Sequence, residues 1–315
     1  MKDAAQDTLL FTIFTATYNR ARLLTRLYES ICHLSGHDFE WVIVDDGSVD
    51  DTEAVVRGFQ EAADFRINYV KKANGGKHTA INTGVAEAKG RFFVIIDSDD
   101  QICPDTLTHF HEAWLAIPDA EKDHFDSICG LLVDDRGQVI GDRFPDDVFD
   151  SDNIDLKYKY RVKGDKLSAV RTEVLRKYPF PENVGRFIPE SYVWYQIGRD
   201  YRSRYINKVV ATAEYQIGGL SDRGLELGIS NPRAMTLYYS SLLALWSRLP
   251  MRELARSAVN LSRFGMHAGR LVWAESSLKA LILQVFLFKV GCFLYLKDKR
   301  TMGKGDRCSN EHDKG

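Results

Sequence analysis

Apolar segments typical of strands alternate with helical segments through the first hundred residues, and this alternation restricts the fold more than any other feature. The strand segments are rich in Val, Ile and Phe and span residues 9–17, 39–45, 66–71 and 92–97. Between them, residues 23–32 carry apolar side chains at helical spacing, and residues 50–52 and 73–77 carry helix-start and turn residues. Chains of this pattern form right-handed β–α–β units. We therefore predict an α/β fold with a mostly parallel central sheet flanked by helices.

Two of these predicted strands end in carboxylates. Asp45 and Asp46 end the second, and Asp97, Asp99 and Asp100 follow the fourth. Ligands collect at the carboxyl ends of strands in open α/β sheets, and crowded carboxylates repel one another unless a cation lies among them. Oxygen ligands suit Mg²⁺ or Mn²⁺, the ions that accompany phosphates. The alternative is that these acids form a solvated turn.

Two common nucleotide-binding motifs are missing after the first strand. A dinucleotide-binding fold would need Gly-x-Gly-x-x-Gly, and a phosphate loop would need Gly-Lys-Ser/Thr with an upstream glycine. Residues 17–20 (TYNR) contain no glycine, and GGK at 75–77 is followed by His. A nucleotide would therefore bind by another route. Asp46 could accept a base imino group, Tyr18 could pack on the ring, and Asp99 could hold a ribose hydroxyl.

Charge is distributed unevenly along the 315 residues. From residue 225 onward there are 14 Lys and Arg against 7 Asp and Glu, although the net charge of the whole chain is −2. This polarity suggests that the tail meets an anionic surface or the acidic body of the same protein. The five cysteines are an odd number without zinc spacing, and residues 1–8 lack an apolar run. Both features favour a reducing cytoplasm over secretion.

Four motifs together resemble glycosyltransferase family 2. They are FTATYN at 14–19, VIVDDGS at 42–48, NGGKHTAINTG at 74–84 and IIDSDD at 95–100. The resemblance covers roughly residues 9–220 and lies in the order and spacing of all four motifs. It implies the GT-A fold, a nucleotide-sugar donor with UDP as the expected nucleotide, a divalent Mn²⁺ or Mg²⁺ cofactor, and transfer of the sugar with inversion at the anomeric carbon.

The resemblance also implies roles for single residues. It places four side chains around the nucleoside, namely those of Thr15, Tyr18, Asp46 and Asp99. Asp100, the last acid of its motif, becomes the direct metal ligand that bridges to the diphosphate. Lys77 would face the nucleotide or its phosphates, and the alternative for it is a solvated lysine at a helix start.

An inverting transfer needs a base that deprotonates the acceptor hydroxyl, and a carboxylate can do this. In the family this acid stands at a helix start beyond the sheet, where the present chain reads GRFIPESYVW at 185–194. Glu190 is therefore the candidate catalytic base. Ser191 replaces the second acid of the usual family pair, which puts the assignment in doubt. The alternative is a structural glutamate favoured by the helix dipole.

A glycine-rich segment at 215–224 carries one arginine, Arg223. It could fold over the diphosphate as a lid, with Arg223 stabilising charge on the leaving group. The alternative is a plain linker. Residues 142–155 are acidic and weakly patterned, so we expect a surface loop there.

We expect three parts in the chain: a GT-A domain at 1–224, a helical region at 225–297 and a polar, disordered tail at 298–315. The apolar run at 280–296 has seventeen residues, interrupted by Gln284 and Lys289, and is shorter than the ~20 residues that span a bilayer. We therefore expect these basic helices to lie in the headgroup region of a membrane. The alternative is that they pack on one another or form a homodimer.

These observations predict a metal-dependent glycosyltransferase, cytoplasmic or peripheral at the inner face of the membrane. Because none of the five tryptophans lies in the Gln-x-x-Arg-Trp motif of processive synthases, we expect a single addition to a glycan or lipid-linked acceptor. No nucleic-acid partner is expected. One alternative is a catalytically silent protein that binds nucleotide sugars or membranes. Another is a sugar nucleotidyltransferase, although its glycine-rich triphosphate loop is missing.

Overall fold

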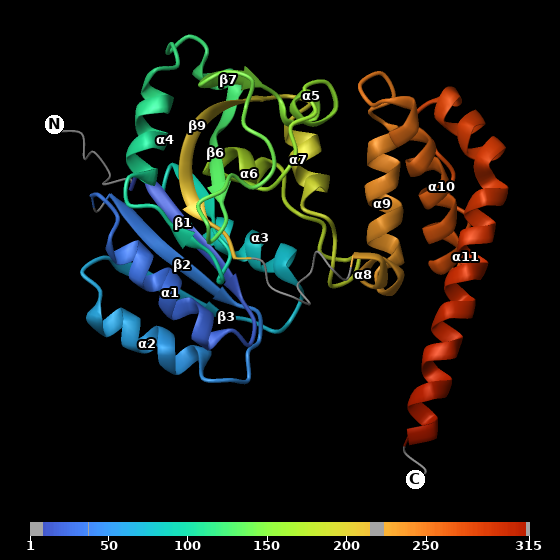
Figure 1. The fold of residues 1–315 in the computed structure, drawn as a ribbon, viewed down its shortest axis with the longest axis horizontal. Coiled ribbons are helices and arrows are strands. Elements are labelled where there is room, and N and C mark those ends of the chain that lie inside the picture. Colours follow the sequence, from blue (N-terminus) through green and yellow to red (C-terminus); the bar gives the residue numbers. More distant parts are fainter. Residues whose placement is uncertain (1–8, 37, 215–223, 313–315) are drawn as a thin grey trace, which may run out of the picture. The chain divides into compact units, whose positions relative to one another are not determined.

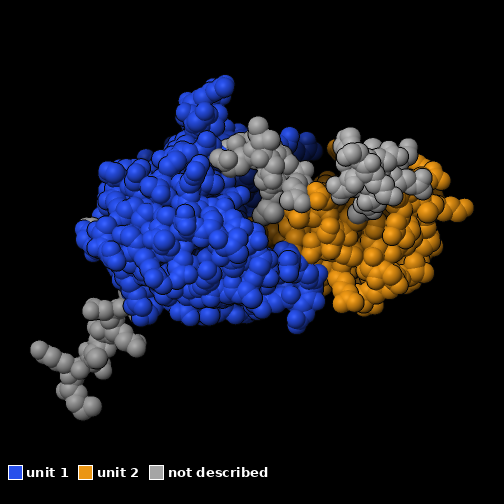
Figure 2. Space-filling view, turned by 90° about the horizontal axis from the view of Figure 1, so that it is seen from below, with its two compact units in different colours: residues 1–186, 193–219 blue, residues 187–192, 220–315 orange. Residues whose placement is uncertain are grey.

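The computed structural model describes residues 9–36, 38–214 and 224–312, with side chains described as far as residue 301. Its contacts divide the chain into two compact units (Figure 2). The first comprises Met1–Arg186 and Val193–Gly219, and the second comprises Phe187–Tyr192 and Leu220–Gly315. The short segment Phe187–Tyr192 thus groups with the C-terminal helices although it lies within the predicted GT-A domain.

The first unit is built on a nine-stranded sheet of order β3-β2-β1-β4-β8-β6-β9-β5, with β7 paired to β9 (Figure 1). Its strands are β1 (Phe11–Thr17), β2 (Phe39–Asp45), β3 (Arg66–Lys71), β4 (Phe92–Ile95), β5 (Gln101–Ile102), β6 (Phe125–Val133), β7 (Val148–Ser151), β8 (Lys166–Arg171) and β9 (Arg202–Thr212). The first four pair in parallel, β8 is antiparallel to both of its neighbours, and β6 pairs in parallel with β9. This sheet and its helices confirm the α/β prediction.

Helices connect the parallel strands, as right-handed crossovers require. The helical elements of this unit are α1 (Ala21–Cys32), α2 (Thr52–Ala62), α3 (Lys77–Glu87), α4 (Thr106–Leu115), the 3₁₀ turn η1 (Lys122–His124), α5 (Asn153–Tyr158) and α6 (Thr172–Lys177). The helix α7 (Ser191–Ile197) begins in Phe187–Tyr192 and continues into the first unit. β1, β2 and β4 are buried along almost their whole length, as their continuous apolar runs predict.

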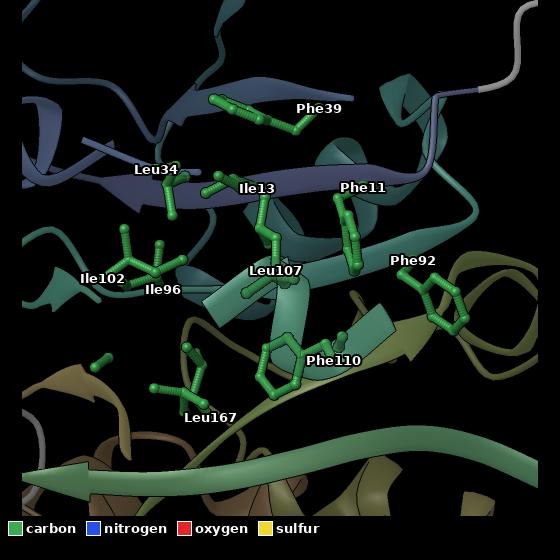
Figure 3. Packing of buried hydrophobic residues seen from close by; sticks show 14 of the residues in the cluster. Phe11, Ile13, Leu34, Phe39, Phe92, Ile96, Ile102, Leu107, Phe110 and Leu167 are labelled. Atoms are coloured by element: carbon green, nitrogen blue, oxygen red, sulfur yellow. The ribbon is translucent and has the colours of Figure 1, made fainter. Parts of the chain in front are cut away.

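One face of the sheet forms the main core with α1, α2 and α4 (Figure 3). Phe11 and Ile13 of β1 contribute to it together with Phe92 of β4, while Leu107 and Phe110 approach from α4. Side chains of a strand alternate between its two faces, so the odd-numbered residues of β1 point into this cluster. The packing fixes the register of the strands that carry the acidic motifs.

The opposite face of β1 is covered by α3 at close range. A Cβ placed on Gly84 of α3 would lie 2.2 Å from the ring of Phe14, which stacks on Phe93. Only glycine permits this approach, although glycine in a helix interior costs about 1 kcal/mol relative to alanine. The close packing holds the start of α3 beside the carboxyl ends of β1 and β2.

The expectation of a surface loop at 142–155 was confirmed for residues 142–147, which form no helix or strand and are mostly exposed, and was wrong for most of the remainder. Val148–Ser151 form β7, an antiparallel partner of β9, and α5 begins at Asn153. The side chain of Asp152 caps α5 by accepting hydrogen bonds from the backbone N–H groups of Ile154 and Asp155. Asp150 therefore lies in a strand and Asp152 caps a helix, while the earlier acids of this segment lie before β7.

The second unit consists of helices. They are α8 (Gly224–Ser230), α9 (Pro232–Leu243), α10 (Met251–His267) and α11 (Leu278–His312), and α10 contacts both α9 and α11. Residues 298–312 continue α11, and the disordered tail expected at 298–315 stays a prediction. The segment Leu278–Thr301, of 24 residues and mean hydropathy 1.8, is long and apolar enough to cross a membrane. The seventeen-residue estimate was too short because the helix extends beyond the apolar run at both ends.

Candidate active site

The acidic ends of the parallel strands meet at one edge of the sheet. β1 lies between β2 and β4, and the parallel register sets Thr17 opposite Asp45 at the ends of β1 and β2. The same register sets Phe14 opposite Ile95, the last residue of β4, so the acidic motif that begins at Asp97 follows at this edge. We call this region the acidic edge; it comprises residues 17–20, 45–48, 72–78 and 97–100.

Asp46 holds the glycine turn before α3. Its Oδ1 accepts hydrogen bonds from Lys72 Nζ and from the Gly75 amide, both at 2.9 Å, and its Oδ2 accepts one from the Gly76 amide at 2.7 Å. A carboxylate offers about four acceptor sites, and the described residues occupy three of them, so one site on Oδ2 could take a further donor. Gly76 has a φ of 95°, and a Cβ there would lie 2.0 Å from the carbonyl oxygen of Arg186. The turn therefore requires glycine.

Hydrogen bonds join the loops after β1 and β2. The Asn19 amide donates to Ser48 Oγ at 2.8 Å, and the Val49 amide donates to Asn19 Oδ1 at 2.9 Å. Asn19 has a φ of 53°, in the left-handed region that asparagine tolerates better than most residues. These contacts fix the two loops relative to each other at the acidic edge.

Arg20 links the loop after β1 to the acidic motif after β4. Its Nη1 donates to Asp99 Oδ2 at 3.1 Å and to Ser98 Oγ at 3.3 Å. The Asp99 side chain is only 12% exposed, so the guanidinium offsets a carboxylate that has little contact with water. Asp99 was predicted to hold a ribose hydroxyl; its Oδ1 has no hydrogen bond from the described residues and could make that contact.

Lys77, at the first position of α3, pairs with Asp97. Its Nζ lies 2.6 Å from Asp97 Oδ1. Burial alone would raise the pKa of Asp97, but the charge and hydrogen bond of Lys77, together with the charge of Arg20, lower it. Asp97 and Asp99 are therefore both held beside cations.

Asp100 is the acid of this motif whose pKa is raised. Burial, followed by repulsion from Asp97 and Asp99, raises the pKa of Asp100 to about 7. Within the described residues, Arg20 pairs with Asp99 and Lys77 pairs with Asp97, and no ion pair is formed by Asp100. A positive charge brought beside Asp100 would lower its pKa and relieve this repulsion.

The carboxylates of the acidic edge could hold a divalent cation whose coordination is completed by a bound phosphate ligand. In the part of the chain that the structure describes, no three His, Cys, Asp or Glu side chains gather as a metal site. Mg²⁺, however, is commonly held by one or two carboxylates together with substrate phosphates rather than by a cage of protein ligands. Asp100 offers such a carboxylate, with repulsion from its neighbours that a cation would relieve.

Two predicted nucleoside contacts, one within β1 and one just after it, differ in exposure. Tyr18 is 48% exposed just beyond the strand, so its ring is accessible to a base. Thr15 is fully buried, and its Oγ1 accepts a hydrogen bond from Trp41 Nε1 at 3.1 Å. Thr15 therefore has a structural role within the sheet, and its contribution to a nucleoside site stays a prediction.

Four residues of the acidic edge were missed by sequence reasoning. They are Thr17, Arg20, Lys72 and His78. Thr17 Oγ1 and His78 Nε2 are buried without a hydrogen-bond partner in the described part of the chain, and such atoms are usually satisfied by water or a ligand. Burial lowers the pKa of His78 although Glu182 and Asp46 oppose this change. His78 could have been found from the sequence because it lies inside the NGGKHT motif. Lys72 could not be found in this way because it precedes that motif.

The candidate base stands outside the sheet. Glu190 is half-buried and directly precedes α7. It belongs to the segment Phe187–Tyr192, which groups with the C-terminal helices, and Ser191 Oγ of this segment donates to Tyr238 Oη of α9 at 3.4 Å. Arg223, the predicted lid residue, lies outside the described residues. The roles of both residues stay predictions.

Comparison with known families decides the classification. The sequence model described as glycosyl transferase family 2 matches residues 12–177, more than half of the chain. The chain belongs to glycosyltransferase family 2. The matched range contains all four motifs and every residue of the acidic edge, which confirms the resemblance seen in the sequence.

The curated relatives match about a third of this family 2 protein. An uncharacterized glycosyltransferase of Nostoc is 36% identical over 103 residues, which are 33% of this chain and 32% of the relative. The poly(ribitol-phosphate) β-N-acetylglucosaminyltransferase TarS of Staphylococcus aureus is 30% identical over 99 residues, 31% of this chain and 17% of TarS. The match thus spans a third or less of these relatives.

Solved structures show that this family member has the GT-A fold. TarS residues 1–349 in complex with UDP-GlcNAc align with a TM-score of 0.60 at 20% identity, covering 82% of this chain and 72% of that one. The mannosyltransferase PcManGT from Pyrobaculum calidifontis, in complex with GDP-Man and Mn²⁺, aligns with a TM-score of 0.55 at 20% identity, covering 92% and 87%. At this identity the likeness establishes the fold and leaves the donor open.

Proposed function

We propose that this protein is a metal-dependent, inverting glycosyltransferase that moves one sugar from a UDP-sugar to a hydroxyl of a glycan or lipid-linked acceptor. The observation that carries the proposal is the charge balance of the acidic edge. Lys72, Lys77 and Arg20 compensate Asp46, Asp97 and Asp99. Asp100 is left with a pKa raised to about 7. This arrangement suits a ligand that brings its own cation.

The donor would be held by residues of the acidic edge. Tyr18 would pack on the base, and the free acceptor site of Asp46 would take the imino N–H of the base. Asp99 would hold a ribose hydroxyl while Arg20 keeps its side chain in place. A divalent cation on Asp100 would offset charge on the diphosphate as the bond to the sugar breaks.

In the transfer, the acceptor oxygen forms a bond to the anomeric carbon from the side opposite the diphosphate, which gives inversion. The bond between the anomeric carbon and the diphosphate oxygen breaks, and UDP leaves with that electron pair. Glu190 takes the proton of the acceptor hydroxyl. Arg223 would stabilise the departing diphosphate.

Calorimetric titration tests donor binding before the acceptor is identified. UDP-GlcNAc, UDP-glucose and GDP-mannose are titrated with and without Mn²⁺, and slow donor hydrolysis is followed in the same samples. We expect a UDP-sugar to bind in a manganese-dependent manner and to be hydrolysed. Selective binding of GDP-mannose would overturn the assignment of UDP, and binding without hydrolysis or transfer would favour a catalytically silent protein.

Two substitutions separate the proposed roles. Asp100→Ala should abolish manganese-dependent donor binding, whereas Asp135→Ala, in an exposed turn, should leave it unchanged. Glu190→Gln should retain donor binding and lose transfer, because the amide cannot take the acceptor proton. Full activity of Glu190→Gln would reassign the base.

A further inference from the structure

One side of α11 is apolar and uncovered in the second unit. Exposed fractions of 46% to 83% are found for Ile282, Val285, Phe286, Val290, Phe293 and Leu296. Their spacing of one, three or four residues places them on one side of the helix. We call these six residues the α11 stripe. Trp273, in the segment before the helix, is also 37% exposed.

The opposite side of α11 is fixed to α10 and to the segment between the two helices by polar contacts. Gln284 is fully buried; its Nε2 donates to Ser262 Oγ at 3.1 Å and to the Val272 carbonyl at 2.7 Å. Its Oε1 accepts the Ala274 amide at 2.7 Å. Leaving these groups without partners would cost free energy, so α11 remains packed on α10 and presents only its stripe.

A second polar contact lies further along α11. Asp298 is 6% exposed and accepts hydrogen bonds from Arg263 Nε at 2.6 Å and from His267 Nε2 at 3.0 Å. If α11 crossed a bilayer alone, it would lose these contacts and those of Gln284. Lys289 would then lie near the middle of the segment Leu278–Thr301, where a charged side chain is costly. The contacts therefore favour a helix that lies in a membrane surface.

The exposed charges of α11 indicate what kind of partner surface could cover the α11 stripe. Its exposed cations are Lys279, Lys289, Lys297, Lys299 and Arg300. Asp298, buried against α10, is the only acid in the segment Leu278–Thr301. A symmetric contact between two copies would bring the same cations face to face, whereas anionic lipid headgroups would neutralise them.

We propose that α11 lies in the plane of an anionic membrane surface. The α11 stripe and Trp273 enter the boundary between headgroups and acyl chains, and the five cations bind lipid phosphates. This proposal concerns the membrane surface to which the protein binds, and it does not depend on which sugar the protein transfers.

Flotation with vesicles tests the proposal on the full-length protein. Phosphatidylcholine vesicles are compared with vesicles that also contain phosphatidylglycerol. We expect binding to the anionic vesicles alone, with release by high salt. The double variant Phe286→Ser/Phe293→Ser should reduce binding at least tenfold because it removes two large exposed rings. Lys279→Gln and Lys297→Gln should each weaken binding by about fivefold.

Matched variants on the first unit control for nonspecific effects. Leu115→Ser removes an apolar side chain that is 59% exposed on α4, and Lys159→Gln removes a cation that is 64% exposed after α5. Both should bind vesicles like the wild type. Circular dichroism checks that each variant keeps its helices, which is expected because the changed side chains are exposed.

Three outcomes would overturn the proposal. The first is a lack of binding to either vesicle by a monomeric wild-type protein. The second is a concentration-dependent dimer, without vesicle binding, that the double phenylalanine variant dissociates, because a second copy would then cover the stripe. The third is a vesicle-bound protein that resists extraction by alkaline carbonate, because α11 would then cross the bilayer. Donor titration remains a separate measurement, so failure here leaves the proposed transferase activity unaffected.

Discussion

Lys77 Nζ lies 2.6 Å from Asp97 Oδ1 and joins the start of α3 to the acidic motif after β4. The sequence predicted that this lysine faces the nucleotide, and the structure gives it a carboxylate partner. The pair keeps Asp97 ionised, since Lys77 lowers the pKa of Asp97 against the effect of burial. The charge of Asp97 in turn helps to raise the pKa of Asp100.

Removal of the Lys77 charge should therefore weaken donor binding. In Lys77→Gln the charge of Asp97 is offset only by the more distant Arg20, and the diphosphate meets an acidic edge with greater negative charge. We expect the dissociation constant of the UDP-sugar to rise about tenfold, measured by calorimetry with Mn²⁺. Lys71→Gln is the matched control because its pair with Glu53 is exposed. Equal effects in the two variants would argue against a local role for Lys77.

Replacement of Asp46 should destabilise the turn before α3. The carboxylate accepts hydrogen bonds from the Gly75 and Gly76 amides and from Lys72. In Asp46→Asn, one oxygen becomes an NH₂ group that cannot accept from these donors, and the partly buried Lys72 loses its charge partner. We expect the free energy of unfolding to fall by about 2–4 kcal/mol in urea denaturation. Asp64→Asn, on an exposed loop, should change it by less than about 0.5 kcal/mol.

Gly76 allows a test that separates backbone strain from close contact. Gly76→Ala should both strain a φ of 95° and force a Cβ against the Arg186 carbonyl. Gly137 has a φ of 75° with no atom within 4 Å of an added Cβ, so Gly137→Ala reports the strain alone. We expect a loss of about 1–2 kcal/mol for Gly137→Ala and a larger loss, together with weaker donor binding, for Gly76→Ala. Similar losses in both variants would mean that the close contact relaxes without cost.

The fold was predictable because, in the first half of the chain, the local sequence pattern of each strand agrees with its burial in the folded sheet. The continuous apolar runs of β1, β2 and β4 match strands that are buried on both faces. The later segments were harder to predict. β7 has only four residues and is half exposed, so its sequence shows little alternation, and its pairing with β9 depends on contacts distant in sequence.

The acidic edge was only partly predictable for a related reason. Motifs identify residues near in sequence, and they gave the carboxylates at the ends of β2 and β4. Lys77 lies inside a motif, but two other cations that offset these acids do not: Arg20 reaches Asp99 across 79 positions, and Lys72 reaches Asp46 across 26. Such partners become visible only when the parallel register brings the strand ends together.

Asp126 provides a test of stability that is remote from the acidic edge. It stands near the start of β6, is 4% exposed, and accepts hydrogen bonds from Ser203 Oγ at 2.8 Å and Ser127 Oγ at 3.1 Å. Burial raises the pKa of Asp126 from 3.8 to about 6, although both serines and Arg171 oppose this shift. Because the folded protein holds this proton more tightly than the unfolded chain, the contribution of Asp126 to stability falls as the pH rises from about 4 to about 6.

Asp126→Asn should therefore stabilise the protein at neutral pH. The amide oxygen still accepts from the two serines, and the cost of an ionised buried carboxylate is removed. We expect a gain of about 2–3 kcal/mol in the free energy of unfolding above pH 6 that disappears below pH 4, following the interval between the two pKa values. Urea denaturation of wild type and variant across this range measures the difference.

Asp123→Asn is the control for this prediction. Its side chain is 96% exposed close to the same strand, so its effect on the free energy of unfolding should not depend on pH in this way. A pH-independent difference for Asp126→Asn would mean that its carboxyl titrates normally in the folded state.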